Sequence, residues 1–162
     1  KKFINKCKSV GIAGLIAVDN NLNSPEEKLL LSGLTKNCIG YTKIISPTNS
    51  EEFIQQSIKN TKNSFIYITT YAGLTGSKNV NLNNVKKLVY KVKKYSKNIP
   101  TGVGFGIKTP KQVKQVSKYA DAVICGSNIV NKIKEGHERS LSAQKLAKFV
   151  GKYVKQLAES TR

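Results

Sequence analysis

Three glycine-rich segments are the part of this 162-residue sequence best suited to bind a ligand. They read Gly73-Leu74-Thr75-Gly76, Gly104-Phe105-Gly106-Ile107 and Gly126-Ser127-Asn128-Ile129-Val130. Glycine lets backbone N–H groups come close to an oxyanion, and the start of a helix adds further unpaired donors. The third segment has the form of such a helix start. We therefore predict an anion site, with an ordinary tight turn as the alternative for any one segment.

The glycine spacing excludes two common nucleotide-binding motifs. Gly102, Gly104 and Gly106 alternate, whereas the dinucleotide fingerprint needs G-x-G-x-x-G and a later acidic residue. The segment 73–78 lacks the Gly-Lys-Ser/Thr ending of a P-loop. A metal site is not predicted either, because the cysteines and the single histidine have no metal-ligand spacing. These residues are Cys7, Cys38, Cys125 and His137.

The elements that must position these segments are short apolar runs alternating with amphipathic helices. Continuous apolar runs are typical of parallel strands that are buried on both faces. The predicted strands are 14–18, 39–45, 65–70, 101–105 and 122–125. Predicted helices follow the caps at Ser24, at Asn49 or Ser50 and at Thr109, and others start near Val85, Gly126 and Ser140. The last one carries an apolar stripe that we expect to be buried: Leu146, Phe149, Val150, Val154 and Leu157.

Regular strand–helix alternation predicts a parallel sheet with right-handed crossovers. A doubly wound open sheet and a (β/α)8 barrel both fit, although a complete barrel needs at least about 200 residues. In both, ligands bind at the carboxyl ends of the strands, where Asp19 is nearly the only acidic residue. Barrels often hold phosphate after their last two strands. Gly106 and Gly126-Ser127 would fit that place if the fourth and fifth predicted strands were strands seven and eight of a barrel.

The charge is strongly positive, with 28 Lys and Arg against 9 Asp and Glu and a net charge of +19. A basic chain can bind nucleic acid, but only Arg139 and Arg162 are arginines, the side chain that base and phosphate recognition favours. The lysines are spread over the polar faces of all predicted helices. We interpret the charge as compositional and keep nucleic-acid binding as an alternative. No apolar stretch has the length of a membrane span, so we expect a cytoplasmic protein without membrane contact.

The beginning of the chain is unusual. There is no methionine, and Phe3, Ile4 and Cys7 recur at helical spacing without a capping residue before them. This pattern is typical of the interior of a helix. We therefore expect the chain to be a fragment.

Taken together, these segments resemble the tryptophan synthase alpha chain family. The similar stretches are 11–19, 46–48, 65–67 and the three glycine-rich segments, in the order and spacing of the family. The resemblance covers the whole chain but only the last five of the family's eight strand–helix units. It implies a partial (β/α)8 TIM barrel of units four to eight, forming a single domain over residues 1–162 without the N-terminal units.

The resemblance also implies a lyase of tryptophan biosynthesis. The family cleaves indole-3-glycerol phosphate to indole and glyceraldehyde 3-phosphate by an aldol-type reaction. Four positions match its ligands of the substrate phosphate: Gly76, Gly106, Gly126 and Ser127. Two match apolar residues around the indole: Ile16 and Ile44. Two match residues that support the catalytic site: Thr75 and Tyr67.

The catalytic glutamate and aspartate of the family belong to its second strand and the loop after it, which have no counterpart here, so no catalytic residue is assigned in this chain. The resemblance implies no cofactor on the alpha chain itself. It implies a pyridoxal-phosphate beta chain as partner in an alpha2-beta2 type complex, in the cytoplasm or the plastid stroma. Another phosphate-binding (β/α)8 enzyme of amino-acid biosynthesis, or a basic nucleic-acid-binding module, stays the alternative.

Overall fold

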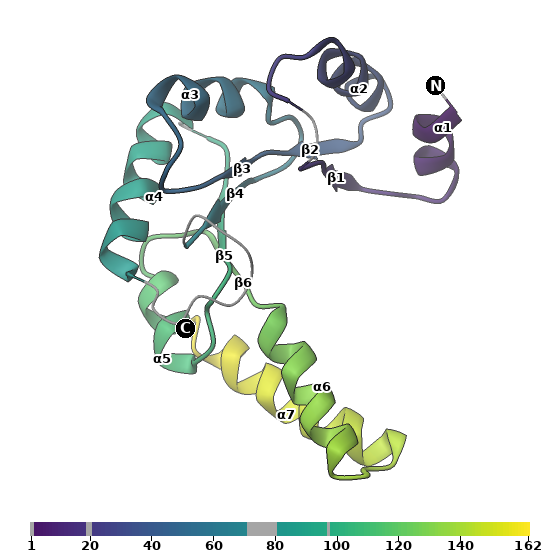
Figure 1. Ribbon diagram of the computed structural model, residues 1–162, viewed down its shortest axis with the longest axis vertical. Coiled ribbons are helices and arrows are strands. Elements are labelled where there is room, and N and C mark those ends of the chain that lie inside the picture. The colour runs from purple at the N-terminus through teal and green to yellow at the C-terminus, as the bar shows by residue number, and fades with distance from the viewer. Residues whose placement is uncertain (1, 19–20, 71–80, 97) are drawn as a thin grey trace.

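The computed structural model describes residues 2–18, 21–70, 81–96 and 98–162, in which parallel strands alternate with helices (Figure 1). The strands are β1 (Gly14–Ile16), β2 (Gly40–Thr42), β3 (Ile44–Ile45), β4 (Ile66–Thr69), β5 (Thr101–Gly104) and β6 (Ala122–Ile124). The helices are α1 (Lys2–Ser9), α2 (Pro25–Lys36), α3 (Glu51–Asn60), α4 (Leu82–Ser96), α5 (Pro110–Val116), α6 (Ser127–Glu138) and α7 (Ala143–Glu159). The predicted alternation is confirmed.

The predicted helix starts rest on side-chain caps. Ser24 Oγ accepts a hydrogen bond from the Glu27 N–H at 3.1 Å, and Ser50 Oγ accepts one from Phe53 at 3.2 Å. Thr109 and Gln112 form a reciprocal capping box at the start of α5. Each cap satisfies N–H groups that have no partner inside the helix. The last helix begins at Ala143 rather than near Ser140.

The strands form two parallel sheets, one in which β1 pairs with β2 and one in which β3 to β6 pair in sequence order. Because only Lys43 separates β2 from β3, the two sheets follow each other as a row. The predicted strand 39–45 is divided at Lys43: its first part pairs with β1 and its second with β4. In Figure 1, α3, α4 and α5 lie along one side of the row, and α6 with α7 extends away from its β6 end. The sheet therefore places the loops after β5 and β6 beside each other, because these strands pair with Gly104 opposite Ile124.

The apolar core has two parts, one on each side of the division at Lys43. The larger part lies between β3–β6 and the helices α3, α4 and α5, with Leu157 of α7 at its margin; the smaller lies between α1, α2 and the strands β1 and β2. The smaller core includes Ile4, whose side chain fits against Gly33, where a Cβ would come within 2.1 Å of the Ile4 Cδ1 atom. Phe3, which recurs with Ile4 and Cys7 at helical spacing, is 58% exposed, whereas Ile4 and Cys7 are buried.

A buried polar cluster joins the two parts of the core. Glu27 of α2 is fully buried and accepts hydrogen bonds from Lys43 Nζ at 2.5 Å and from Tyr41 Oη at 2.9 Å. Asn60 of α3 and the backbone N–H of Asn23 donate to its second oxygen at 2.9 and 2.7 Å. A buried charge needs such partners. At the division of the predicted strand, Lys43 is only 4% exposed, and its side chain is turned to the carboxylate of another element.

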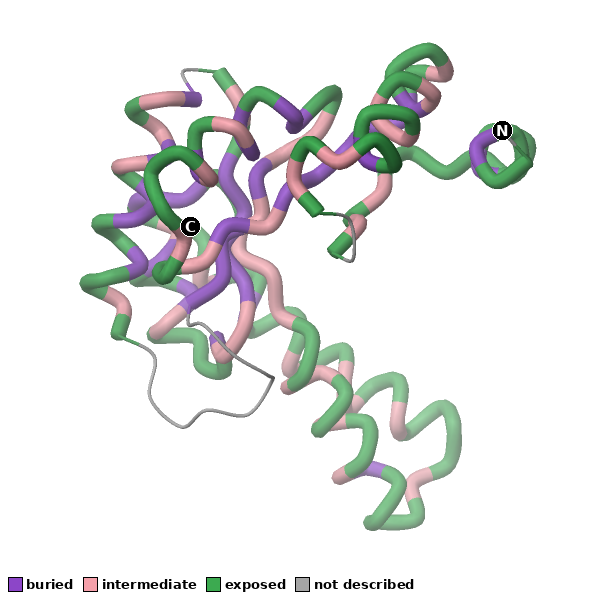
Figure 2. Tube along the Cα trace, turned by 45° about the horizontal axis from the view of Figure 1, so that its top comes forward, coloured by how far each residue is buried: buried purple, intermediate pink, exposed green. Residues whose placement is uncertain are grey.

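The apolar stripe of α7 is less buried than its periodicity predicts. Of the five residues expected inside, only Leu157 is buried, and Val154 is 39% exposed. Figure 2 shows that α6 and α7 are mostly exposed or intermediate along their length. The two helices pack on each other and extend away from the sheet. The apolar stripe of α7 is therefore covered by one neighbouring helix rather than by a whole layer of the fold. None of the described helices combines the length and the apolar character needed to cross a bilayer.

We expect the chain to self-associate, because β1 and β6 end the row and each pairs with only one described strand. Unpaired edges and exposed apolar side chains favour association. Beside β1 the exposed ones include Ile12, Ile16 and Val18. Sedimentation velocity over a range of concentrations should show association that Ile16→Lys weakens. The control Leu29→Lys, at a 70% exposed position on α2, should leave it unchanged. A monodisperse monomer at all concentrations would contradict this prediction.

Candidate functional site

The loops after β5 and β6 bring two of the predicted glycine segments together. After β5, Phe105 and Gly106 take the left-handed conformation, with φ of 68° and 71°. Glycine adopts this conformation freely, whereas the bulky Phe105 is held there by its surroundings. One restraint is the Thr70 hydroxyl, which donates to the Phe105 carbonyl at 2.5 Å. After β6, Gly126 begins α6 directly, so the chain turns from strand to helix within two residues.

Backbone donors are available in both loops. Among the described residues, the N–H groups of Gly106 and Ile107 have no hydrogen-bond acceptor, nor have those of Gly126, Ser127 and Asn128. The carbonyl of Gly126, the residue before α6, accepts hydrogen bonds from the N–H groups of Ile129 and Val130. Such N–H groups at a helix start carry partial positive charge and favour anions. The two neighbouring loops therefore offer the backbone chemistry of an oxyanion site.

Tyr67 lies under the loop after β5. Its ring meets Phe105 edge-on, with centroids 5.7 Å apart, and its hydroxyl occupies the space where a Cβ on Gly104 would stand, 2.1 Å from such an atom. Burial raises the pKa of Tyr67, and burial also raises the pKa of the neighbouring Cys125 thiol. Both groups are therefore neutral near pH 7. Gly104 has a packing role, since it makes room for Tyr67.

The two positions predicted to border an indole lie on β1 and β3, apart from the loops after β5 and β6. Ile44 of β3 lines a cavity of about 350 Å³ at the carboxyl ends of the strands. The other lining residues come from the segment after β1, from Lys43 just before β3, and from the β3–α3 connection with α3. They are Ala17, Val18, Asn21, Leu22, Lys43, Ser46, Asn49 and Phe53. Ile16 ends β1 beside this cavity and is 48% exposed. Thr75 and Gly76, like Asp19, lie outside the described residues.

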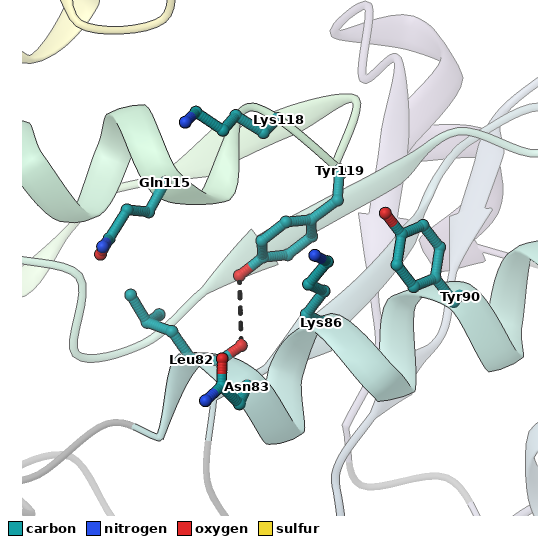
Figure 3. A pocket seen from close by; sticks show the side chains of 7 residues that line it. All are labelled: Leu82, Asn83, Lys86, Tyr90, Gln115, Lys118 and Tyr119. Atoms are coloured by element: carbon teal, nitrogen blue, oxygen red, sulfur yellow. Dashed lines mark hydrogen bonds between the residues drawn. The ribbon is translucent and has the colours of Figure 1, made fainter.

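A second cavity, of about 260 Å³, lies between α4 and the end of α5 (Figure 3). It is lined by Leu82, Asn83, Lys86, Tyr90, Gln115, Lys118 and Tyr119. The Tyr119 hydroxyl reaches the Leu82 carbonyl at 3.5 Å and closes one side. This cavity belongs to the layer of helices and includes none of the predicted site residues.

Two of the described acidic groups, Asp121 and Glu27, are held by hydrogen bonds within the fold. Asp121 precedes β6 and so lies at the opposite end of the sheet, where it accepts bonds from Thr101 N–H and Oγ1 at 2.8 Å and from Lys93 at 2.9 Å. Burial would raise the pKa of Asp121, but these hydrogen bonds hold it below its ordinary value. Glu27 is held by the polar cluster. In the described ranges, no group of three or more His, Cys, Asp and Glu could hold a metal ion.

Two polar arrangements were not predicted from the sequence: the cluster around Glu27 and the contacts of the Asn128 side chain. A charged residue inside the apolar run 39–45 was the one available signal for the cluster around Glu27. No local signal marked Asn128, because its partners lie on other elements.

A row of parallel strands with helical crossovers and glycine-rich loops at its carboxyl ends is the architecture of (β/α)8 barrel proteins, here in part. Structural neighbours of this architecture cover nearly the whole chain. The chain belongs to the tryptophan synthase alpha chain family, a family of lyases, whose model matches residues 1–161. The expected family and fold class are confirmed.

Relatives in several bacteria show the extent of the match. The tryptophan synthase alpha chain of Thermoanaerobacter sp. strain X514 is 33% identical over 150 residues, which is 93% of this chain and 55% of the relative. That of Janthinobacterium sp. strain Marseille is 34% identical over 158 residues, which is 98% of this chain and 58% of the relative. The solved alpha subunit from Legionella pneumophila strain Paris superposes with a TM-score of 0.79 at 26% identity, covering 99% of this chain and 56% of that one. The chain thus spans little more than half the length of its relatives.

Proposed function

We propose that this chain forms the phosphate-binding part of a lyase that cleaves indole-3-glycerol phosphate to indole and glyceraldehyde 3-phosphate. In this proposal, Gly106, Gly126 and Ser127 bind the substrate phosphate through backbone N–H groups, together with Gly76. Ile16 and Ile44 border the indole ring. Tyr67 and Thr75 support the reacting part of the site.

The observation that carries the proposal is the pair of neighbouring loops with free N–H groups, in a chain of this family. A phosphate bound there would meet donors from two loops and the positive end of a twelve-residue helix. The net charge of +19 favours the approach of an anion further. The cavity at Ile44 supplies apolar surface at the same edge of the sheet, as an indole ring requires.

The proposal includes the setting of the reaction. Indole would pass to a tryptophan synthase beta chain, in a complex of the alpha2-beta2 type, and pyridoxal phosphate would belong to that partner, so that this chain needs no cofactor of its own. The carboxylates that transfer protons would come from the second strand–helix unit of a complete barrel. We place the protein in the cytoplasm or the plastid stroma, where its substrate would be made.

Gly126→Asp should weaken the binding of inorganic phosphate by on the order of tenfold or more. A carboxylate within about 5 Å of a bound phosphate repels it at an effective dielectric constant near 20. An added Cβ at Gly126 meets no atom within 4 Å, and aspartate is a favourable N-cap, so the fold should not suffer. Dissociation constants can be measured from the shifts of backbone amide signals in NMR titrations.

Gly126→Asn is the matched control, since it adds the same shape and capping ability without charge. It should bind phosphate more tightly than Gly126→Asp, with a similar thermal midpoint. Equal phosphate affinity of the two variants and the unchanged chain would place the anion elsewhere and contradict the assignment of Gly126 and Ser127.

A further inference from the structure

The carbonyl of Lys108 is a meeting point of three segments that surround the candidate phosphate site. The hydroxyl of Tyr153, in α7, donates to it at 2.8 Å, and Asn128 Nδ2, in the first turn of α6, donates to it at 3.1 Å. Asn128 Nδ2 also lies 3.2 Å from the Tyr153 hydroxyl oxygen. The three groups therefore form a closed triangle that links the loop after β5, the start of α6 and the C-terminal helix.

The loop after β5 is fixed on both sides of its free N–H groups. On one side, the Phe105 carbonyl accepts from Thr70. On the other, the Lys108 N–H donates to Gln112 Oε1 at 2.8 Å, while its carbonyl is held by Tyr153 and Asn128. Between these anchors stand Gly106 and Ile107, whose N–H groups have no acceptor among the described residues. The bonds thus restrain the loop and leave its donors open.

Helix α7 is itself held against α6 beside this triangle. Lys132 of α6 places its ammonium 5.9 Å from the centre of the Tyr153 ring and 5.2 Å from that of Phe149, within the range of cation–π attraction. The same ammonium pairs with Glu135 at 2.5 Å. These contacts restrict the Tyr153 side chain, so its hydroxyl has little freedom to leave the Lys108 carbonyl.

We propose that Tyr153 and Asn128 are positioning residues of the phosphate site, which set the distance between the free N–H groups of the β5 loop and those at the start of α6. This inference rests on the proposed function. Neither side chain needs to touch the phosphate, because both act through the Lys108 carbonyl. The C-terminal helix then contributes to ligand binding as well as to packing, since a site made of two loops binds an anion well only when both hold their donors in place.

The test compares the binding of inorganic phosphate by the full chain and by Tyr153→Phe and Asn128→Ala. Each variant should raise the dissociation constant by roughly threefold to tenfold, because one hydrogen bond contributes about 0.5–1.5 kcal/mol. The thermal midpoint should change little. The double variant should weaken binding by less than the product of the single effects, because both residues act on one carbonyl. Tyr95→Phe is the matched control, since that hydroxyl bonds to Glu51, away from the loops, and its loss should leave phosphate binding unchanged.

The possible results separate the two proposals. If the unchanged chain binds no phosphate, the phosphate site and the positioning role are both overturned. If it binds phosphate with shifts at Gly106, Gly126 and Ser127, and both variants bind equally well, only the positioning role is overturned. The positioning role is also overturned if phosphate affinity falls only in proportion to a lowered thermal midpoint. It is overturned as well if Tyr95→Phe weakens phosphate binding as much as the two variants do. Weaker binding at an unchanged midpoint, with non-additive coupling, supports the proposal.

Discussion

The chain alone is expected to release no detectable indole from indole-3-glycerol phosphate. The reaction needs a group that protonates the indole ring and a base that takes a hydroxyl proton, and each such group contributes about 10² to 10⁴ in rate. Asp121 lies at the end of the sheet opposite the carboxyl ends of the strands, and Glu27 is fully buried and hydrogen-bonded to Lys43. Asp19 is the one acidic residue outside the described ranges. Losing both groups should therefore leave almost no catalysis.

Indole should form when a polypeptide carrying the first three strand–helix units of a relative is added. Indole can be followed by its absorbance or by a colour reaction after extraction. The added polypeptide alone, and the mixture containing Gly126→Asp, are the controls, and both should give less product than the mixture with the unchanged chain. Turnover by the lone chain would show that its own residues transfer the protons, and our assignment of catalysis would be wrong.

Glu27→Gln is expected to destabilise the fold by about 3–5 kcal/mol, the cost typical of leaving one partner of a buried ion pair uncompensated. Lys43 would keep its charge at 4% exposure, and the new amide would point a donor at Asn60 or at the Asn23 N–H. Urea unfolding followed by circular dichroism measures the change. Glu51→Gln is the matched control: its pair with Lys91 is about half exposed, so its removal should destabilise the fold far less than Glu27→Gln.

The double variant Glu27→Gln with Lys43→Met should recover much of the lost stability, because it removes the orphaned charge. Stability should also depend on pH in a defined direction. Burial alone would raise the pKa of Glu27, but the bonds from Lys43, Asn23 and Tyr41 hold it below its ordinary value of 4.5. The contribution of Glu27 is then fully present above pH 4.5 and is lost as the pH falls below that value. Equal stability of Glu27→Gln and the unchanged chain would contradict this account.

The sequence by itself determined the elements whose causes are local. The caps at Ser24, Ser50 and Thr109 act on N–H groups three residues away, so the order of residues is enough to predict them. Continuous apolar runs predicted parallel strands buried on both faces, which is confirmed for β2, β4 and β5, whereas β1 and β6 contain no buried residue. The glycine segments predicted where open backbone donors would stand. Their combined order and spacing also predicted the family, which matches over residues 1–161. The assignments of the site residues stay predictions, and Thr75 and Gly76 lie outside the residues that the structure describes.

Only the tertiary structure decided which distant groups meet. Glu27 and Lys43 are 16 residues apart, and they meet where the predicted strand 39–45 is divided into two. Asn128 and Tyr153 reach the Lys108 carbonyl across 20 and 45 residues. The apolar stripe of α7 predicted a packed face, but its period says nothing about how much surface a neighbour supplies, and α6 covers it only in part. Such contacts depend on how whole elements pack, because a hydrogen bond needs its two atoms within about 3 Å whatever their separation in the chain.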